Sequence, residues 1–192
     1  MLPSRHADRL TAYADLVRRW AGKLDLVSPG DLARFESRHI ADSLRALDLL
    51  ADLPEGAGVD VGSGAGLPGI PLAVCDSRHS WRLLEPRARR AAFLDEVVRL
   101  LELECEVIAM TAEEASRDRR LARAHVVATA RALAAPEVAA ERLRPLLAEE
   151  GTGVLWLGER ASRPRQSRAW REGIAIIRGA PQGPNDDFAE QS

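Results

Sequence analysis

The sequence predicts an α/β fold with a mostly parallel sheet, helices on both faces and an N-terminal helical cap. From Val59 onward, short apolar segments alternate with segments of helical spacing, which is typical of strand–helix–strand units. The first fifty residues instead carry apolar side chains at helical spacing throughout. A chain of 192 residues with 46% hydrophobic and 29% charged residues is typical of a single soluble domain.

The domain is expected to consist of a helical cap over residues 1–52, a core over 56–178 and a loose tail over 179–192. In the cap, a first helix extends past Trp20, and Ser28 begins a break that can cap a second, kinked or split helical stretch. The tail is rich in proline, glycine and aspartate, so we expect no packed structure there.

Six strands are expected in the core: Val59–Val61, Trp81–Glu85, Cys105–Ala109, His125–Ala130, Gly153–Leu157 and Gly173–Arg178. Four helices are expected between them: Ile70–Val74, Arg87–Leu101, Glu113–Arg119 and Pro136–Leu147. No seventh strand is expected from the tail, because its prolines and acids cannot sustain a buried ladder. The last strand would then either pair directly with its predecessor or remain an exposed edge, which would allow a homodimer instead of a monomer.

Residues 58–71 contain the most informative motif, an apolar strand that ends in an acid and is followed by glycines. Gly62, Gly64 and Gly66 can take positive φ and let a ligand lie against bare backbone. A dinucleotide-binding fingerprint places its third glycine three residues after the second. Here it comes after two, and Asp60 precedes the first glycine by two. The pattern therefore resembles motif I of the Rossmann-like class I methyltransferases, which use S-adenosylmethionine (SAM), more than an NAD site.

Four further residues are expected near this loop, because ligands on such sheets lie at the carboxyl ends of the strands. Glu85 ends the second strand, where an acid binds ribose hydroxyls; alternatively it is a favourable charge at a helix start. Ala112 and Glu113 follow the third strand, where an adenine-binding loop would lie, although Glu113 equally fits a first-turn helix acid. Arg131 follows the fourth strand and would pair with a cofactor carboxylate or an RNA phosphate, or else form a surface salt bridge.

Charge and cysteine content restrict the partners. The net charge is −2, so nucleic-acid binding must depend on a local patch; the best candidate is the arginine-rich segment 160–171, where Trp170 could stack on a base. Cys75 and Cys105 lack metal-ligand spacing, which predicts no metal site and fits a reducing cytoplasm. No apolar run approaches membrane-spanning length, so no membrane association is expected.

The chain resembles the glucose-inhibited division protein B family, the bacterial 16S rRNA guanine-N7 methyltransferases, from roughly Tyr13 to Gly158. The most specific match is Asp60–Pro71, whose Leu-Pro-Gly-Ile-Pro ending extends beyond a generic methyltransferase loop. The segment Arg38–Ser43 is similar to the family's Arg-His-Ile-x-Asp-Ser. The segment after the second strand matches at Leu84-Glu85-Pro86, Arg89-Arg90 and Phe93-Leu94, and the turn after the fourth matches at Ala130-Arg131-Ala132.

The resemblance implies methylation of N7 of guanine 527 in 16S rRNA, as free RNA or within the small ribosomal subunit, with SAM as cofactor. By the same match, SAM would contact Gly62, Leu67, Ala112, Glu113 and Arg131. Together with the residues chosen from the pattern alone, the expected cofactor site comprises Asp60, Gly62, Gly64, Leu67, Glu85, Ala112, Glu113 and Arg131. Guanine N7 has a free lone pair, so alignment suffices and no general base is required. His39 and Arg131 are nominated only as candidates for a catalytic role, because a lone histidine more often serves packing.

The chain departs from the family pattern at three places. One is the C-terminal end, where no further apolar strand is expected after Gly173–Arg178 although the family usually has one. Ala21, Asp25 and Val27 stand where the family usually has two asparagines and a threonine, and Trp156-Leu157-Gly158 lacks the usual lysine. Two alternatives therefore stay open: a methyltransferase that acts on another substrate such as a small molecule, and an interaction module, with or without SAM, that has lost catalysis.

Overall fold

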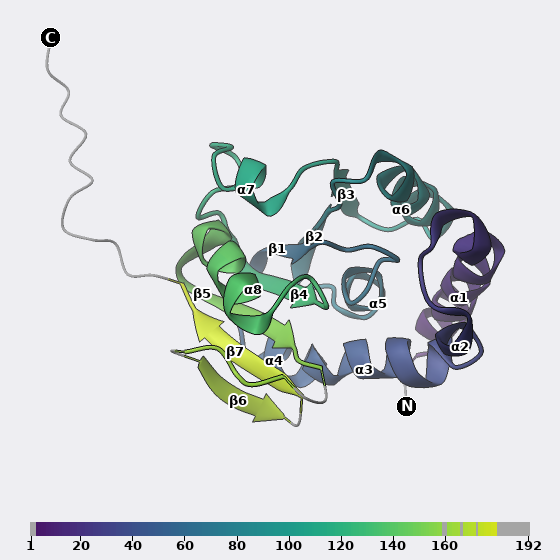
Figure 1. The fold of residues 1–192 in the computed structure, drawn as a ribbon. Helices are drawn as coiled ribbons and strands as arrows, with labels where there is room; N and C mark the ends of the chain where they lie inside the picture. Colours follow the sequence, from purple (N-terminus) through teal and green to yellow (C-terminus); the bar gives the residue numbers. More distant parts are fainter. Residues whose placement is uncertain (1–2, 159–160, 166, 172, 180–192) are drawn as a thin grey trace, which may run out of the picture.

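The computed structural model describes residues 3–158, 161–165, 167–171 and 173–179. They form a seven-stranded sheet with the order β3-β2-β1-β4-β5-β7-β6 (Figure 1). Strands β1 to β5 pair in parallel, whereas β7 is antiparallel to both of its neighbours. The bounds are β1 Gly56–Val61, β2 His79–Leu84, β3 Cys105–Ile108, β4 His125–Arg131, β5 Leu147–Trp156, β6 Ser167–Arg171 and β7 Ile174–Arg178. The mostly parallel sheet confirms the predicted fold class.

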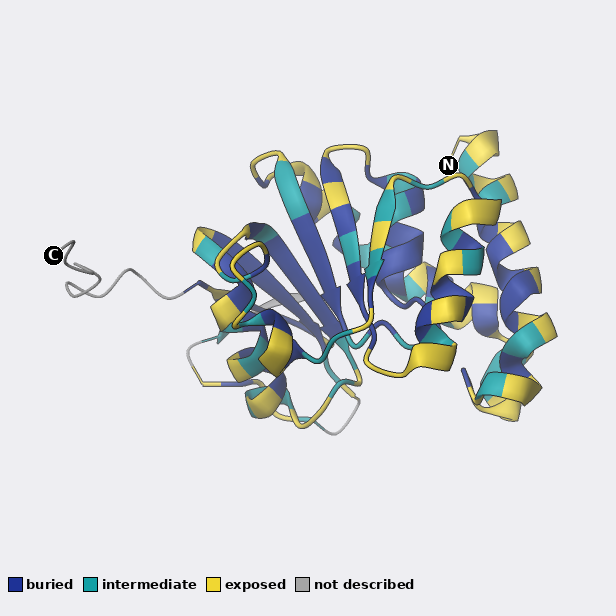
Figure 2. Ribbon diagram, turned by 90° about the horizontal axis from the view of Figure 1, so that it is seen from above, coloured by how far each residue is buried: buried dark blue, intermediate teal, exposed yellow. Residues whose placement is uncertain are grey.

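Helices cover both faces of the sheet, and the strands between them are largely buried (Figure 2). One face packs against α1 (Ser4–Leu24), α4 (Leu47–Ala51), α5 (Gly69–Cys75) and α6 (Ala88–Leu100). The other packs against α7 (Ala112–Ala115) and α8 (Pro136–Leu143). No helix in the described ranges has the length and apolar character needed to cross a membrane.

The N-terminal cap confirms the predicted break and the split second stretch. Ser28 caps the short helix α2 (Pro29–Leu32) by accepting a hydrogen bond from the backbone N–H of Asp31 at 3.2 Å. The chain then forms a π-helix over Phe35–Ile40 and a helical turn, α3, over Ala41–Ser43. A 3-10 turn over Leu44–Ala46 leads into the α-helix α4. This series lies beside the sheet at the bottom of the view in Figure 1.

The prediction of six strands is wrong. The strand that was not expected is β6, which comes from the arginine-rich segment before β7. Among the described residues, it pairs with β7 and forms the edge of the sheet. An edge strand needs no continuous apolar run, so hydrophobic patterning does not reveal it. β7 pairs directly with β5, with Val154 opposite Ile176. This is the first of the two predicted arrangements, in which the last strand pairs with its predecessor. The exposed-edge alternative is wrong, because β6 covers that edge and Ile174, Ile176 and Ile177 are buried. Residues 180–192 of the predicted tail lie outside the described residues.

Two helices end earlier than predicted. α7 spans only Ala112–Ala115, and α8 ends at Leu143, where a 3-10 turn over Arg144–Leu146 begins. Pro145 lies in that turn and has no N–H to donate, which favours the end of the helix there.

Candidate functional site

The strand order reverses between β1 and β4. The chain runs outward from β1 to β2 and β3 and then returns to β4 on the other side of β1. Ligands of open α/β sheets lie at such a reversal of strand order. The predicted cofactor-site residues lie at the carboxyl ends of β1, β2, β3 and β4 or in the segments that follow them, so the topology brings them to one edge.

The loop after β1 has the backbone conformation that its glycines predict. Gly62, Gly64 and Gly66 have φ of +71°, +55° and +98°, a region that other residues rarely adopt. A Cβ at Gly62 would lie 2.5 Å from Cδ1 of Leu133, which belongs to the segment after β4. The loop therefore presents bare backbone, and a side chain at position 62 would require both an unfavourable φ and a shift of Leu133.

Asp60 lies beneath the loop and joins three elements. Its side chain is fully buried; one carboxylate oxygen accepts from the Gly69 N–H at 3.2 Å and the other from the Thr129 hydroxyl at 2.7 Å. Burial raises the pKa of Asp60 to about 6, although the hydrogen bonds that its carboxylate accepts lower the pKa in part. These contacts connect the end of β1 to the start of α5 and to β4. Leu67, also predicted at the site, is 9% exposed and packs in the core beneath the loop.

Tyr13 is a site residue that sequence analysis missed. It is fully buried in α1, and its hydroxyl donates a hydrogen bond to the Ala65 carbonyl at 2.8 Å. A Cβ at Gly66 would lie 3.1 Å from the same hydroxyl. From the sequence, Tyr13 belongs to the helical apolar pattern, and nothing there indicates a contact with a loop 52 residues away.

Glu85 is fixed by two backbone hydrogen bonds. Its side chain accepts from the Gly64 N–H at 2.9 Å and from the Arg87 N–H at 3.0 Å, and the residue is 4% exposed. The bond to Arg87, the residue before α6, matches the alternative of a charge at a helix start. The bond to Gly64 ties Glu85 to the glycine loop. A carboxylate has about four acceptor positions, so the ribose role also stays open.

Ala112 and Glu113 begin α7 and lie beyond the end of β3. The helix starts there because Thr111 and Glu114 form a capping box with hydrogen bonds of 2.8–3.1 Å. Ala112 is buried, whereas Glu113 is exposed and forms an ion pair with Arg142 of α8 at 2.7 Å. The first-turn position fits the alternative role of Glu113, and its contact with a ligand stays a prediction.

Arg131 connects the end of β4 to the cap segment Arg38–Ser43. One guanidinium nitrogen donates to the His39 carbonyl at 3.1 Å; the other donates to His39 Nδ1 at 2.9 Å and lies 3.1 Å from the Asp42 carboxylate. Only 17% of the Arg131 side chain is exposed. Arg131 therefore does form a salt bridge, but a largely buried one that joins the cap to the sheet.

His39 is neutral in this arrangement. A guanidinium only donates hydrogen bonds, so Nδ1 of His39 accepts and the ring proton is on Nε2, 3.5 Å from the Asp31 carboxylate. Burial and the Arg131 charge lower the pKa of His39, although Asp31 opposes the shift. The ring also packs on Phe35, with centroids 5.9 Å apart. These contacts support a packing and anchoring role.

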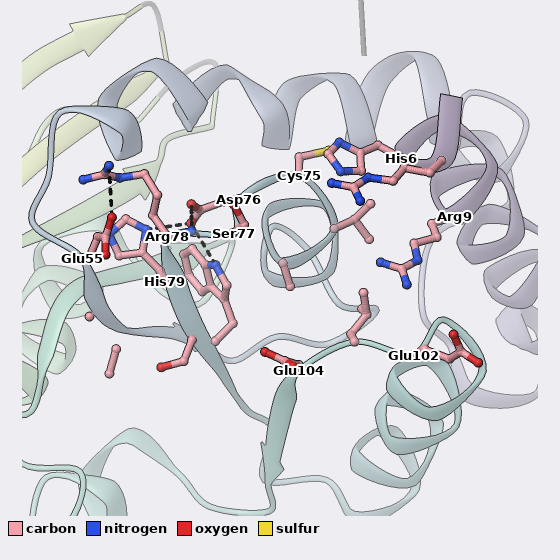
Figure 3. A pocket seen from close by; sticks show the side chains of 18 residues that line it. His6, Arg9, Glu55, Cys75, Asp76, Ser77, Arg78, His79, Glu102 and Glu104 are labelled. Atoms are coloured by element: carbon pink, nitrogen blue, oxygen red, sulfur yellow. Dashed lines mark hydrogen bonds and ion pairs between the residues drawn. The ribbon is translucent and has the colours of Figure 1, made fainter. Parts of the chain in front are cut away.

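The opposite edge of the sheet contains a cavity of about 760 Å³ at the amino ends of β1 and β2 (Figure 3). There the Asp76 carboxylate accepts hydrogen bonds from His79 Nδ1 at 2.7 Å and from Trp81 Nε1 at 3.2 Å. These partners account for the buried Asp76–His79 pair without a ligand. Across the described ranges, no three His, Cys, Asp or Glu residues are grouped so that they could hold a metal ion.

Comparisons with known proteins agree with this geometry. A family model described as rRNA small subunit methyltransferase G matches residues 6–169. A ribosomal RNA small subunit methyltransferase G of Gluconobacter oxydans is 41% identical over 88% of this chain and 85% of its own length. One from Mycobacterium marinum is 40% identical over 90% of this chain and 76% of its own.

Solved structures show the same fold at low identity. A protein of Corynebacterium glutamicum has a TM-score of 0.59 at 13% identity, covering 91% of this chain and 92% of its own. A mutant of MtNAS in complex with S-adenosylmethionine has a TM-score of 0.56 at 12% identity, covering 91% and 76%. With a family model that matches most of its length, the chain belongs to the GidB family, the rRNA small subunit methyltransferases G.

Proposed function

We propose that this protein is a SAM-dependent methyltransferase that modifies ribosomal RNA, and specifically N7 of guanine 527 in 16S rRNA. Family membership supports the general activity. The observation that carries the proposal is the connected arrangement at the carboxyl edge, where Glu85 bonds the glycine loop and Arg131 bonds the family-like Arg38–Ser43 segment. Its substrate would be reached in the cytoplasm, as 16S rRNA or the small subunit.

The residues present fit SAM as the cofactor. Gly62 and Gly64 leave bare backbone at the loop, and a Cβ at Gly62 would collide with the side chain of Leu133. Glu85 retains acceptor capacity for ribose hydroxyls, and the segment of Ala112 and Glu113 lies next along the edge. Asp60 and Leu67 are buried, so we assign them to supporting the loop from below. The Arg131 guanidinium supplies a positive charge for an anionic group.

When bound, SAM supplies an electrophilic methyl group on a positively charged sulfur. The chain's own residues need only orient the acceptor, because guanine N7 carries an in-plane lone pair and loses no proton. Such alignment can contribute several kcal/mol to lowering a barrier. His39 accepts a hydrogen bond from Arg131, so it serves as an anchor and not as a general base.

The proposal is tested with tritiated SAM and small subunits from a strain that lacks its own enzyme, followed by mapping of the labelled base. We expect label at guanine 527 and none with Gly62→Arg. Free 16S rRNA, run in parallel, shows which form is the substrate. Gly30→Ala is the control, because Gly30 is exposed and a Cβ there meets nothing within 4 Å.

The outcomes separate the alternatives. Label at another nucleotide would refute the guanine 527 assignment while keeping the enzyme class. SAM binding by calorimetry without any label would favour an interaction module without catalysis or a methyltransferase that acts on another substrate. Absence of SAM binding, in a protein that is folded by circular dichroism, would refute the proposal as a whole.

A further inference from the structure

A cavity of about 660 Å³ lies between the end of α1, the loop that follows it and the start of α6. We call it the basic groove, and its charged lining residues are Lys23, Asp25, Arg87, Arg89 and Arg90. Its volume is within the range of sites for nucleotide-sized ligands. It adjoins the glycine loop, because the Arg90 guanidinium lies 4.0 Å from the position that a Cβ on Gly64 would take.

The groove concentrates positive charge on a chain whose net charge is −2. Four of its lining residues are cations, and Asp25 is the single acid among them. In the part of the chain that the structure describes, none of the four cations forms an ion pair with a carboxylate. Their charge is therefore available to an anion that enters the groove.

The arginines are held in place by neutral groups. Arg89 donates to the Lys23 carbonyl at 3.3 Å and Arg90 to the Leu24 carbonyl at 3.4 Å, both at the C-terminal end of α1. Carbonyl groups orient a guanidinium without cancelling its charge. The first turn of α6 contains these arginines and no acid, although acids are the favoured charges at a helix start. The local charge thus costs some stability, which a bound anion would offset.

The remaining walls are apolar, with Leu24, Val27, Pro29 and Leu32 lining the groove beside the cations. Cations beside an apolar wall suit a nucleotide, whose phosphate pairs with the cations while its base packs against carbon. We propose that the basic groove binds the single-stranded RNA that flanks the target nucleotide, and so guides the base to the glycine loop. This inference depends on the proposed rRNA methyltransferase function.

The test compares two double variants with the same change in charge. Lys23→Gln/Arg87→Gln removes two of the four groove cations. It leaves Arg89 and Arg90, which donate hydrogen bonds to carbonyl groups of α1, in place. Arg5→Gln/Arg9→Gln is the control at the cavity on the opposite edge. The probe is a fluorescent single-stranded RNA with the 16S sequence around guanine 527, with binding measured by anisotropy at several salt concentrations. SAM binding is measured separately by calorimetry.

We expect the groove variant to weaken RNA binding about tenfold and to lower the slope of log K against log salt by about 1.4, or about 0.7 for each phosphate that is no longer neutralised. The control is expected to change RNA affinity less than about twofold, and SAM affinity is expected to stay unchanged in both. An equal decrease in the control would show that total charge matters and would overturn the proposal. So would loss of SAM binding in the groove variant, which would assign the groove to the cofactor, or a wild-type protein that does not bind the probe.

The binding assay requires no methyl transfer, so the two proposals fail separately. Groove-dependent RNA binding without label on small subunits would refute the proposed activity and keep the groove. Label at guanine 527 with RNA binding that is unaffected by the groove variant would do the reverse.

Discussion

The buried pair between Arg131 and Asp42 gives a quantitative prediction about how the cap is held to the sheet. Arg131→Ala removes the ion pair of 3.1 Å and both hydrogen bonds to His39. The Asp42 carboxylate, of which 27% is exposed, loses this partner but keeps its ion pair with Arg45 at 2.8 Å. One charged hydrogen bond contributes about 1.5–3 kcal/mol, and the loss of the two hydrogen bonds to His39 adds to the cost. We therefore expect the free energy of unfolding to fall by about 3 kcal/mol.

For a chain of this length, each kcal/mol shifts the melting temperature by about 2–4 °C. Scanning calorimetry should therefore show a decrease of about 6–12 °C for Arg131→Ala. Asp42→Asn keeps an oxygen that can accept a hydrogen bond from Arg131 and loses only the charge. We therefore expect its melting temperature to decrease by about 2–4 °C. The double variant should lose less stability than the two single variants lose together. The difference, which is the coupling energy between the two residues, is expected to be about 1 kcal/mol or more.

Arg119→Ala, at an exposed arginine with no ion pair to a described residue, is the control and is expected to change the melting temperature by less than about 1 °C. The reasoning is refuted if Arg131→Ala melts within about 1 °C of wild type, or if the losses in the double variant are additive. SAM affinity is the second measurement. A loss of about tenfold or more in Arg131→Ala, well beyond that in Asp42→Asn, would indicate that Arg131 also contacts the cofactor.

Three further predictions concern the loop. Gly62→Ala should abolish measurable SAM binding by calorimetry, because alanine is strained at positive φ and its Cβ would displace the Leu133 side chain. Tyr13→Phe should lose about 1 kcal/mol of stability, seen as about 2–4 °C in the melting temperature, since the buried Ala65 carbonyl loses its donor. Asp60→Asn should flatten the dependence of stability on pH. The pKa of Asp60 in the folded protein is about 6, above the usual value of 3.8. Its contribution to the free energy of unfolding therefore rises by about 3 kcal/mol as pH falls from above 6 to below 4.

Each of these predictions has a contrary result. SAM binding by Gly62→Ala that equals that of a Gly30→Ala control would show that SAM does not need the glycine at position 62. A Tyr13→Phe protein with unchanged melting and SAM affinity would remove the tyrosine from the site. For Asp60→Asn, melting curves from acid to neutral pH that parallel those of wild type would contradict the raised pKa of the carboxyl group.

The local motifs were predictable from the sequence because their causes are local. Positive φ at Gly62 follows from a strand-to-helix turn that only glycine adopts easily. The cap at Ser28 depends on a side chain and an N–H three residues away. Parallel pairing of β1 to β5 follows from the alternation of strands and helices, because parallel neighbours need a crossover connection.

Only the tertiary structure decided which residues these motifs contact. Tyr13 meets Ala65 across 52 residues, and Arg131 meets His39 across 92; neither helical spacing nor strand pattern encodes such a partner. The edge strand β6 was missed for a related reason, because its pairing depends on the exposed side of β7 and not on its own apolar content. The sequence alone determined the turn geometry and the family, through residues whose conformational limits are intrinsic. Packing decided the rest, because a buried donor or charge takes the partner that the fold brings within reach.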